Sequence, residues 1–284
     1  MSARIASLKL GLIGDNIGAS RSPRLHRLAG EQAGLDVTYD RLVPQERGED
    51  FGTIVACARA AGYRGLNITY PYKEQVMALV AVDDPVVAAM GAVNTVLFEA
   101  DGPRGFNTDF SGFIAAHGAV RGAAMPGPTL VIGTGGVGRA IAFALARIGA
   151  VDLRLADRDS AKAAKLAEDL AARFPGLALS TGADAEAMAH GADGVVNCTP
   201  VGMVGYPGTP LAADAMKGAV WAFDAVYTPA DTQFLCDAAR LGLVTISGWE
   251  LFFFQGLHAW RLFSGRDADP RALRAALQTE ADLP

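Results

Sequence analysis

The feature that most limits how this chain can fold is a glycine-rich turn directly after a short apolar run. The run covers residues 129–132, the turn covers Gly133–Gly138, and an alanine-rich helical pattern continues to residue 147. A strand, a tight glycine turn and a helix in this order predict a βα unit whose strand lies in a parallel sheet. We therefore expect a Rossmann-type α/β domain around this turn.

The glycines of the turn fit the spacing G-x-G-x-x-G at Gly133, Gly135 and Gly138. The first glycine permits the tight turn, the second lets backbone N–H groups approach a pyrophosphate, and the third permits close helix–strand packing. The following helix adds its positive N-terminus. Glycine turns also occur for packing alone, but a strand before the turn and a helix after it favour a dinucleotide site.

The acidic residue expected of such a site is Asp157, 19 positions beyond Gly138 and directly after the predicted strand 152–156. A carboxylate there accepts hydrogen bonds from the adenosine ribose hydroxyls, which favours NAD. The alternative is a helix N-cap, a role that Asp159 or Ser160 could also fill. Arg158 could pair with the neighbouring carboxylates or stack on the adenine.

The 284 residues are enough for two domains. The first third alternates strand-like and helix-like segments, and the alternation restarts at residue 129 after a glycine- and proline-rich stretch, residues 118–128, that we take as a boundary. Predicted strands cover 8–13, 37–42, 65–69, 92–98, 129–132, 152–156, a segment near 177, 194–197, 220–224 and 243–247. Predicted helices begin near Pro23 or cover 50–61, 73–80, 85–90, 136–147, 160–173 and 250–264.

Composition excludes several classes of protein. The net charge is -5 and no block of lysine and arginine offers a track for phosphates, so we expect no nucleic-acid partner. Apolar runs fall short of a membrane span, and Met1–Leu8 lacks the apolar core of a secretory signal, so we expect a cytoplasmic protein. Cys57, Cys198 and Cys236 are predicted to be buried thiols in a reducing compartment, neither disulfides nor zinc ligands.

A second group of polar residues lies in the first third of the chain. Ser22 is a predicted N-cap with Pro23 at the first helical position, and Ser20 lies close by, so hydroxyls and free amides could form a carboxylate-sized anion site. Taken alone, the motif is better explained as an ordinary capped helix. Lys73, Asn94 and Asp109 follow segment ends, where each alone would usually be a capping residue or a surface charge.

Together these motifs resemble the shikimate and quinate dehydrogenase family, in order and over nearly the whole chain. The matching stretches are Ser20-Arg21-Ser22-Pro23, residues 65–73, residues 91–95, residues 105–109, the glycine turn, residues 197–203 and Gln255-Gly256. The resemblance implies an α/β substrate-binding domain, residues 1–117 completed by 249–284. It also implies a Rossmann NAD(P)-binding domain, residues 118–248, with the active site in the cleft between the two.

The resemblance also implies a role for each matching residue. Ser20 and Ser22, helped by Tyr227, would hold a substrate carboxylate, and Lys73 with Asp109 would be catalytic. Hydride reduction of a ketone leaves an alkoxide, for which an ammonium supplies both charge and proton. The other implied substrate contacts are Asn67, Thr69, Asn94 and Gln255. The implied cofactor contacts are Gly133, Gly135, Gly136, Val137, Gly138, Asp157, Arg158, Thr199, Pro200 and Gly248.

No metal is expected, because the four histidines are isolated in the sequence and no metal-ligand cluster competes with the lysine. Many NADP-using members carry a small polar residue and then arginine after the second Rossmann strand, whereas this chain has Asp157-Arg158-Asp159. The segment 248–252 is also bulkier than the methionine-containing segment of the family. Residues 157–159 lead us to expect that NAD is favoured, with NADP still open, whereas the segment 248–252 bears on packing at the nicotinamide side.

The expected reaction is reversible hydride transfer between nicotinamide and shikimate or 3-dehydroshikimate, the chemistry of aromatic amino acid biosynthesis. The alternatives are quinate, a related hydroxy or amino acid, and a non-catalytic ligand sensor; a sensor has no need of both Lys73 and Asp109. The expected partner is the small-molecule substrate, with neither nucleic acid nor membrane, and the expected assembly is a monomer or a homodimer.

Overall fold

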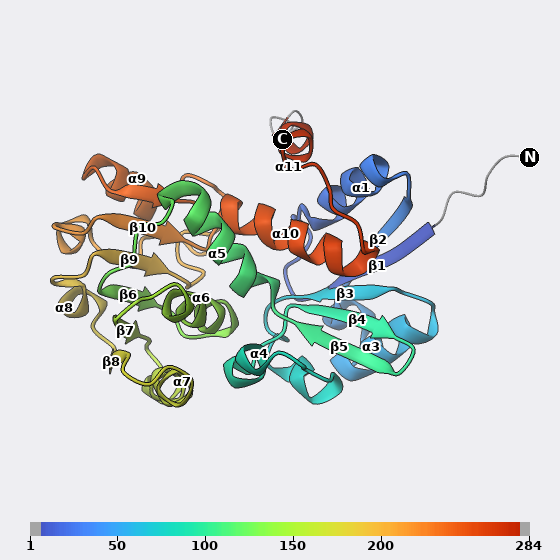
Figure 1. Cartoon of the computed structure of the whole chain (residues 1–284), viewed down its shortest axis with the longest axis horizontal. Helices are drawn as coiled ribbons and strands as arrows, with labels where there is room; N and C mark the ends of the chain where they lie inside the picture. Colours follow the sequence, from blue (N-terminus) through green and yellow to red (C-terminus); the bar gives the residue numbers. More distant parts are fainter. Residues whose placement is uncertain (1–6, 279–284) are drawn as a thin grey trace, which may run out of the picture. The chain divides into compact units, whose positions relative to one another are not determined.

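The structure is a computed structural model that describes residues 7–278, and the chain divides into two compact units. Unit 1 takes the described residues up to Thr108 and those from Gln255 onward, and unit 2 takes Asp109–Phe254. The divisions fall after residues 108 and 254, whereas the sequence led us to place the boundaries after residues 117 and 248. Both units are α/β, as predicted (Figure 1).

Unit 1 contains a mixed five-stranded sheet with the strand order β2-β1-β3-β4-β5. The strand β1 is parallel to both β2 and β3, whereas β3, β4 and β5 are antiparallel neighbours. The strands are β1 (Ser7–Ile13), β2 (Asp36–Leu42), β3 (Gly65–Ile68), β4 (Thr95–Glu99) and β5 (Gly102–Phe106).

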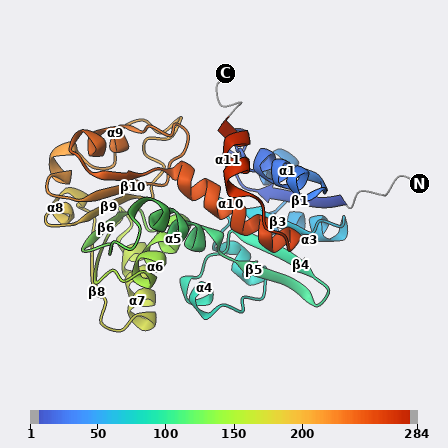
Figure 2. The same cartoon turned by 45° about the horizontal axis from the view of Figure 1, so that its top comes forward.

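Helices cover both faces of this sheet (Figure 2). On one face, Ile54 of α3 packs in a core with Leu66 and Val96 of the sheet. On the other face, Gly256 of α10 lies against Leu25 of α1. The helices of unit 1 are α1 (Ser22–Ala33), α2 (Pro44–Arg47), α3 (Phe51–Ala60), the 3-10 helix η1 (Gln75–Leu79), α4 (Pro85–Met90), the second part of α10 (Gly248–Ser264) and α11 (Pro270–Gln278).

Strand direction brings several loops to one edge of the unit 1 sheet. The last residue of β1, Ile13, pairs with Ile68 at the end of β3. Because β4 is antiparallel to β3, its first residue Thr95 pairs with Asn67, and Thr95 also pairs with Phe106 at the end of β5. The segments after β1, β3 and β5 and before β4 therefore share this edge.

Unit 2 contains a parallel six-stranded sheet with the order β11-β10-β9-β6-β7-β8, the doubly wound arrangement expected of a Rossmann domain. Its strands are β6 (Thr129–Ile132), β7 (Asp152–Ala156), β8 (Ala178–Gly182), β9 (Gly194–Asn197), β10 (Trp221–Asp224) and β11 (Val244–Ile246). Its helices are α5 (Thr108–Arg121), α6 (Gly136–Arg147), α7 (Ser160–Arg173), α8 (Ala185–Ala189), the 3-10 helix η2 (Ala213–Met216), α9 (Gln233–Arg240) and the first part of α10.

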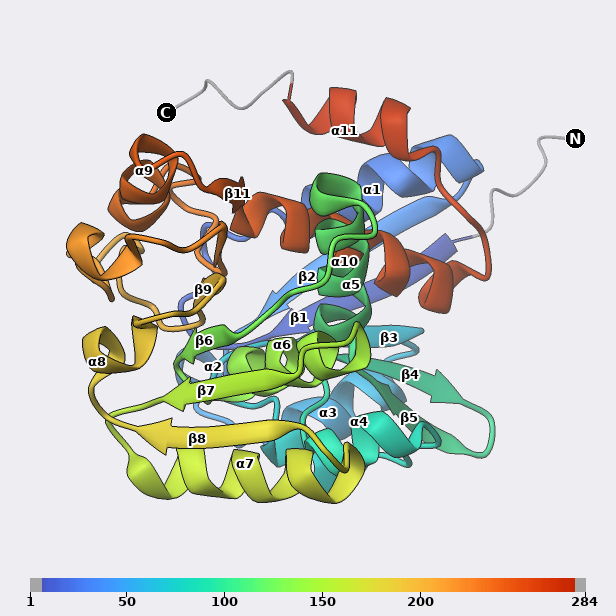
Figure 3. The same ribbon diagram turned by 60° about the vertical axis from the view of Figure 1, so that its left-hand side comes forward.

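Helices pack on both faces of the unit 2 sheet (Figure 3), and alternate residues of its strands point to opposite faces. Ala222 of β10 packs in a core with Met216 of η2 and Phe234 of α9. The next residue, Phe223, packs edge-to-face on Phe113 of α5, with ring centroids 4.9 Å apart. Both faces are thus covered, which explains why the strands β6, β9 and β10 are buried at every position.

Several sequence predictions were wrong. No strand was predicted where β5 lies, and the predicted boundary stretch 118–128 begins inside the last turn of α5. The predicted helix 73–80 is the shorter η1. Cys57 and Cys236 are exposed and Cys198 is half-buried, so the thiols are not the buried groups that we expected. Among residues 7–278, no helix has both the length and the apolar character needed to cross a membrane.

Candidate functional site

The loop after β1 brings two serine hydroxyls together at the start of α1. Ser22 Oγ accepts a hydrogen bond from Ser20 Oγ at 3.2 Å, and the Ser22 backbone N–H lies 3.3 Å from Ser20 Oγ. The N-cap is Arg21, without a side-chain cap, so the prediction of Ser22 as N-cap was wrong by one residue. Because the Ser22 hydroxyl contacts Ser20 instead of capping the helix, the two hydroxyls lie together as candidate donors to an anion at the positive end of α1.

Thr69 and Lys73 follow β3 at the same edge. The Thr69 N–H donates to the carbonyl of Ile13 at 2.9 Å. A Cβ on Gly14 would lie 2.2 Å from Thr69 Cγ2, so only glycine permits this approach. The Lys73 carbonyl accepts from the Val93 N–H at 2.8 Å, and the Lys73 side chain is buried, with 8% exposure. The lysine is therefore buried beside the edge of the unit 1 sheet and is not on the surface.

Asn94 lies just before β4, and hydrogen bonds fix the orientation of its amide. Its Oδ1 accepts from the Thr108 N–H at 2.7 Å, from Thr108 Oγ1 at 3.1 Å and from Thr95 Oγ1 at 3.0 Å. The Thr108 hydroxyl also lies 3.4 Å from Gln255 Oε1. Because the Asn94 oxygen already accepts these hydrogen bonds, the amide N–H groups are the part of the side chain that can serve as donors to a ligand.

Asn67 lies behind Asn94 in the same buried network. Its Oδ1 accepts from Tyr39 Oη at 2.8 Å, and its Nδ2 donates to Thr95 Oγ1 at 3.2 Å. The His26 ring stacks on Tyr39 with centroids 5.1 Å apart. Burial lowers the pKa of His26 to about 3, although its hydrogen bond with Asn67 opposes this shift. The network is thus neutral at physiological pH.

In unit 2, two of the three spaced glycines meet a steric demand, and the third leaves open space. Gly133 has φ 91°, in the left-handed region that favours glycine. A Cβ on Gly138 would lie 1.9 Å from the Gly133 carbonyl oxygen, whereas a Cβ on Gly135 would meet nothing within 4 Å. Gly135 is the N-cap of α6, without a side-chain cap. The open side of Gly135 and the uncapped helix N-terminus fit a pyrophosphate.

Asp157 follows β7 and is oriented by three hydrogen bonds. Its Oδ2 accepts from the Thr134 N–H at 2.7 Å and from Thr134 Oγ1 at 2.8 Å, and its Oδ1 accepts from the Asp159 N–H at 2.9 Å. Partial burial opposes ionisation, but these hydrogen bonds together lower the pKa of Asp157 below its usual value. Asp159 is the N-cap of α7, so that role does not need Asp157. Arg158 is exposed.

The loops after β9 and β10 carry Thr199, Pro200 and Tyr227. The Thr199 N–H and hydroxyl donate to Asn197 Oδ1 at 2.9 and 2.7 Å, and the Tyr227 ring stacks on Phe252 with centroids 5.2 Å apart. A Cβ on Gly248 would lie 2.4 Å from the Val226 carbonyl oxygen, so the start of α10 needs glycine there.

Asp109 lies in the first turn of α5 with 6% exposure, and the contact division assigns it to unit 2. The sequence did not single out the residues that orient the site: Thr95, Thr108, Thr134, Asn197 and Asp224. All except Asp224 lie inside or beside the motif stretches, so closeness to a motif was the available signal.

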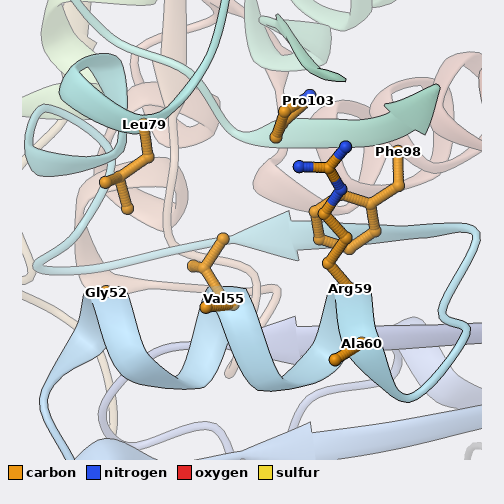
Figure 4. Close-up of a pocket in the computed structure, with 8 residues that line it drawn as sticks. Gly52, Val55, Arg59, Ala60, Leu79, Phe98 and Pro103 are labelled. Carbon is orange, nitrogen blue, oxygen red and sulfur yellow. The ribbon is translucent and has the colours of Figure 1, made fainter. Parts of the chain in front are cut away.

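The hollow in Figure 4 lies elsewhere in unit 1. It is lined by Val55 and Arg59 of α3, Leu79 of η1, Phe98 of β4 and Pro103 of β5. The site residues predicted from the sequence are not part of its lining. Within residues 7–278, no group of three or more histidine, cysteine, aspartate or glutamate residues could hold a metal ion.

Two family models match the chain, one in each unit. The shikimate dehydrogenase substrate binding domain matches residues 12–96. The saccharopine dehydrogenase NADP binding domain matches residues 129–228. The second match agrees with the dinucleotide-binding shape of unit 2.

Curated relatives and solved structures are similar over almost the whole chain. The chain is 40% identical to a quinate/shikimate dehydrogenase (NAD(+)) of Corynebacterium efficiens, over 95% of this chain and 97% of that protein. It is 38% identical to a shikimate dehydrogenase (NADP(+)) of Pseudarthrobacter chlorophenolicus, over 97% and 96%.

Two solved structures extend the comparison to three dimensions. Quinate dehydrogenase from Corynebacterium glutamicum in complex with NAD has a TM-score of 0.88 at 35% identity, covering 95% of this chain and 98% of that one. Shikimate 5-dehydrogenase from Thermus thermophilus, with NADP(H) and shikimate, has a TM-score of 0.83 at 34% identity and the same coverage. This chain belongs to the shikimate and quinate dehydrogenase family.

Proposed function

We propose that this protein is an NAD-dependent dehydrogenase that interconverts shikimate and 3-dehydroshikimate by hydride transfer. The observation that carries the proposal is the edge of the unit 1 sheet, where Ser20, Ser22, Thr69, Asn94 and Lys73 follow or precede neighbouring strands. Anion-binding hydroxyls, an oriented amide and a buried ammonium are the groups needed for a polyhydroxylated carboxylic acid.

The substrate carboxylate would accept hydrogen bonds from the hydroxyls of Ser20 and Ser22, with Tyr227 as a further donor. Ring hydroxyls would accept from the Asn94 amide, whose oxygen is already filled by Thr108 and Thr95. Thr69 and Gln255 complete the proposed contacts. Asn67, with both amide atoms engaged inside the unit, supports Thr95 more directly than it could support a ligand.

Lys73 would act as the proton donor in reduction and the proton acceptor in oxidation. When bound, the nicotinamide supplies or takes up the hydride. The ketone oxygen becomes an alkoxide as hydride arrives, so an ammonium within hydrogen-bond reach stabilises the developing charge and then protonates it. Asp109 is proposed as the second catalytic residue, a carboxylate that accepts from the reacting hydroxyl or from an ammonium. A ligand sensor would not require this pair.

The cofactor preference rests on Asp157. Its carboxylate is fixed by Thr134 and the Asp159 N–H, and it would accept hydrogen bonds from ribose hydroxyls. A 2′-phosphate there would meet like charge, so NAD is favoured over NADP. Gly133, Gly135, Gly136, Val137 and Gly138 would hold the pyrophosphate. Arg158 would stack on the adenine, and Thr199, Pro200 and Gly248 would line the nicotinamide side.

Quinate is the second candidate substrate, because relatives that use NAD are named for quinate as well as shikimate. Quinate carries an extra hydroxyl on the carbon that bears the carboxylate. We place the discrimination beside Ser22, where an unpaired buried hydroxyl costs about 1–3 kcal/mol.

Steady-state kinetics with shikimate and with quinate test both candidate substrates. We expect kcat/KM for shikimate with NAD to exceed that for quinate by roughly ten- to a hundredfold, as this penalty implies. Equal efficiencies or a preference for quinate would show that Ser22 does not set the choice. Turnover of neither acid would overturn the proposed function.

We also propose a cytoplasmic location, supported by three free thiols, two of them exposed. A monomer or a homodimer remains our prediction for the assembly.

A further inference from the structure

Two buried polar side chains lie next to each other where β9 and β10 end. Asn197 and Asp224 are the last residues of these strands and are register partners. Both have 0% exposure, and Asn197 Nδ2 donates to Asp224 Oδ1 at 2.9 Å. A buried charge is costly unless several donors satisfy it, so the partners of this carboxylate indicate its purpose.

Asp224 holds both ends of the loop that carries Tyr227. At the near end, the Val226 N–H donates to Asp224 Oδ1 at 2.9 Å. At the far end, Thr232 Oγ1 donates to Asp224 Oδ2 at 2.6 Å, while the same hydroxyl caps α9 by accepting from the Leu235 N–H. The loop residues in between, 228–230, are exposed. The hydrogen bonds from Val226 and Thr232 to Asp224, here called the near clip and the far clip, therefore fix where the loop begins and ends.

Asn197 holds the neighbouring loop, which carries Thr199 and Pro200. Its Oδ1 accepts from the Thr199 N–H and hydroxyl, and its Nδ2 donates to the Val201 carbonyl at 3.1 Å as well as to Asp224. All donors and acceptors of this amide are therefore used in one arrangement. The two N–H groups of Nδ2 can both be used, one by the Val201 carbonyl and one by Asp224, only while the Asp224 carboxylate is there as an acceptor.

We propose that Asp224 is a positioning residue that fixes the Tyr227 loop directly and the Thr199–Pro200 loop through Asn197. The inference rests on the proposed function, which assigns Tyr227 to the substrate carboxylate and Thr199 with Pro200 to the nicotinamide side. One buried carboxylate would then set the geometry of a substrate contact and of a cofactor contact at once.

The experiment compares four variants with the wild type in NAD titration calorimetry and in steady-state kinetics with shikimate. Asp224→Ala removes all three accepted bonds. Thr232→Val removes only the far clip of the Tyr227 loop, and Thr232→Ser keeps the hydroxyl. Asp237→Ala is the matched control, because Asp237 is also buried in unit 2 but pairs with Gln233 and Arg240 of its own helix.

For Asp224→Ala we expect the NAD dissociation constant and the KM for shikimate each to rise about tenfold, as loss of charge-assisted hydrogen bonds implies. The value of kcat should fall less than threefold. Thr232→Val should raise the KM for shikimate and leave NAD binding within twofold. Thr232→Ser and Asp237→Ala should match the wild type in both constants.

The idea is wrong if folded Asp224→Ala keeps both constants within twofold, or if Thr232→Val weakens NAD binding as much as it raises KM. Should Asp224→Ala fail to fold, the Thr232→Val and Thr232→Ser pair still decides, since only the valine variant loses the clip. A wild-type protein that binds NAD but does not oxidise shikimate would instead refute the proposed function, leaving the NAD arm to test Asn197 and its loop.

Discussion

The two units hold their candidate site residues by different chemistry. In unit 1, the Asn94 amide is oriented by neutral groups, the hydroxyls of Thr95 and Thr108 and an N–H of the backbone. In unit 2, the orienting groups are carboxylates. Asp157 accepts hydrogen bonds from the glycine turn and from Asp159, and Asp224 holds the loops after β9 and β10 in place. A neutral network keeps its hydrogen bonds across pH, whereas a buried carboxylate makes stronger bonds but depends on its ionisation.

Lys73 is the charged group that the neutral network of unit 1 would serve, so its removal should give the largest effect. Lys73→Ala should lower kcat by about a hundredfold or more, the usual scale for loss of a general acid, with a much smaller change in KM. Lys217→Ala is the control, because this exposed lysine pairs only with Asp214 among the ion pairs of the described chain. A Lys73→Ala enzyme with near wild-type kcat would remove the lysine from the mechanism.

The stability of unit 2 should depend on pH through Asp224. Burial raises the pKa of Asp224 to about 6, well above the usual value for an aspartate, although hydrogen bonds from Thr232, Val226 and Asn197 oppose the shift. Because the folded pKa is raised, ionisation is disfavoured in the folded state. The free energy of unfolding should fall as pH rises from about 4 to above 6, by about 3 kcal/mol in all.

Denaturant unfolding of the wild type and Asp224→Asn at pH 4 and pH 7 isolates this contribution. The stability of the variant relative to the wild type should rise by about 2 kcal/mol between the two pH values, because the unfolded aspartate is already partly ionised at pH 4. His26 is present in both proteins, so its own titration cancels in the difference. A relative stability that stays constant would mean that Asp224 titrates as it does in the unfolded chain.

Thr95→Val tests the neutral network in the same way. The substitution leaves Asn67 Nδ2 without its acceptor and removes one donor to Asn94 Oδ1. The free energy of unfolding should fall by about 1–3 kcal/mol, the cost of unsatisfied buried polar groups. In contrast to Asp224→Asn, the loss should be equal at pH 5 and pH 8, measured by the same unfolding assay, and a strongly pH-dependent loss would break the contrast between the units.

The preference between NAD and NADP should change when Asp157, the second orienting carboxylate of unit 2, is removed. A unit charge about 4 Å from Asp157, at an effective dielectric constant near 20, costs roughly 4 kcal/mol before Arg158 and solvent offset it. Asp157→Ser should shift the ratio of kcat/KM values toward NADP by about tenfold, whereas Asp184→Ser, at the N-cap of α8, should not. A wild-type enzyme that already prefers NADP would contradict the electrostatic argument.

Much of the fold was predictable where local chemistry decides the structure. The strand 129–132 and the helices 136–147 and 160–173 match their predicted limits, because glycines mark the turn and Asp159 caps the next helix. The strand β5 was missed because its sequence, Gly-Pro-Arg-Gly-Phe, has low strand propensity. It forms as the edge strand of the sheet, a position where the missing N–H of Pro103 is tolerated, and its outer side makes a short bridge with Ala81.

The candidate site was predictable only in part. The residues that motifs mark were named from the sequence, but the side chains that orient them were not. Asp224 shows why: its partners Asn197 and Thr232 lie 27 and 8 positions away, and nothing local in the sequence connects the three. A hydrogen-bond network across strands depends on register, which only the folded sheet supplies.

The discontinuous composition of unit 1 has a consequence for its biosynthesis. Leu25 and Gly65 leave the ribosome early, but they pack against Gly256 and Phe263, which follow only after all of unit 2 has been made. At typical translation rates this delay is on the order of 10 s. During that time the nascent N-terminal segment has no C-terminal helix to cover it, so unit 2 can finish folding while the first-made segment still exposes the apolar surface that α10 later covers.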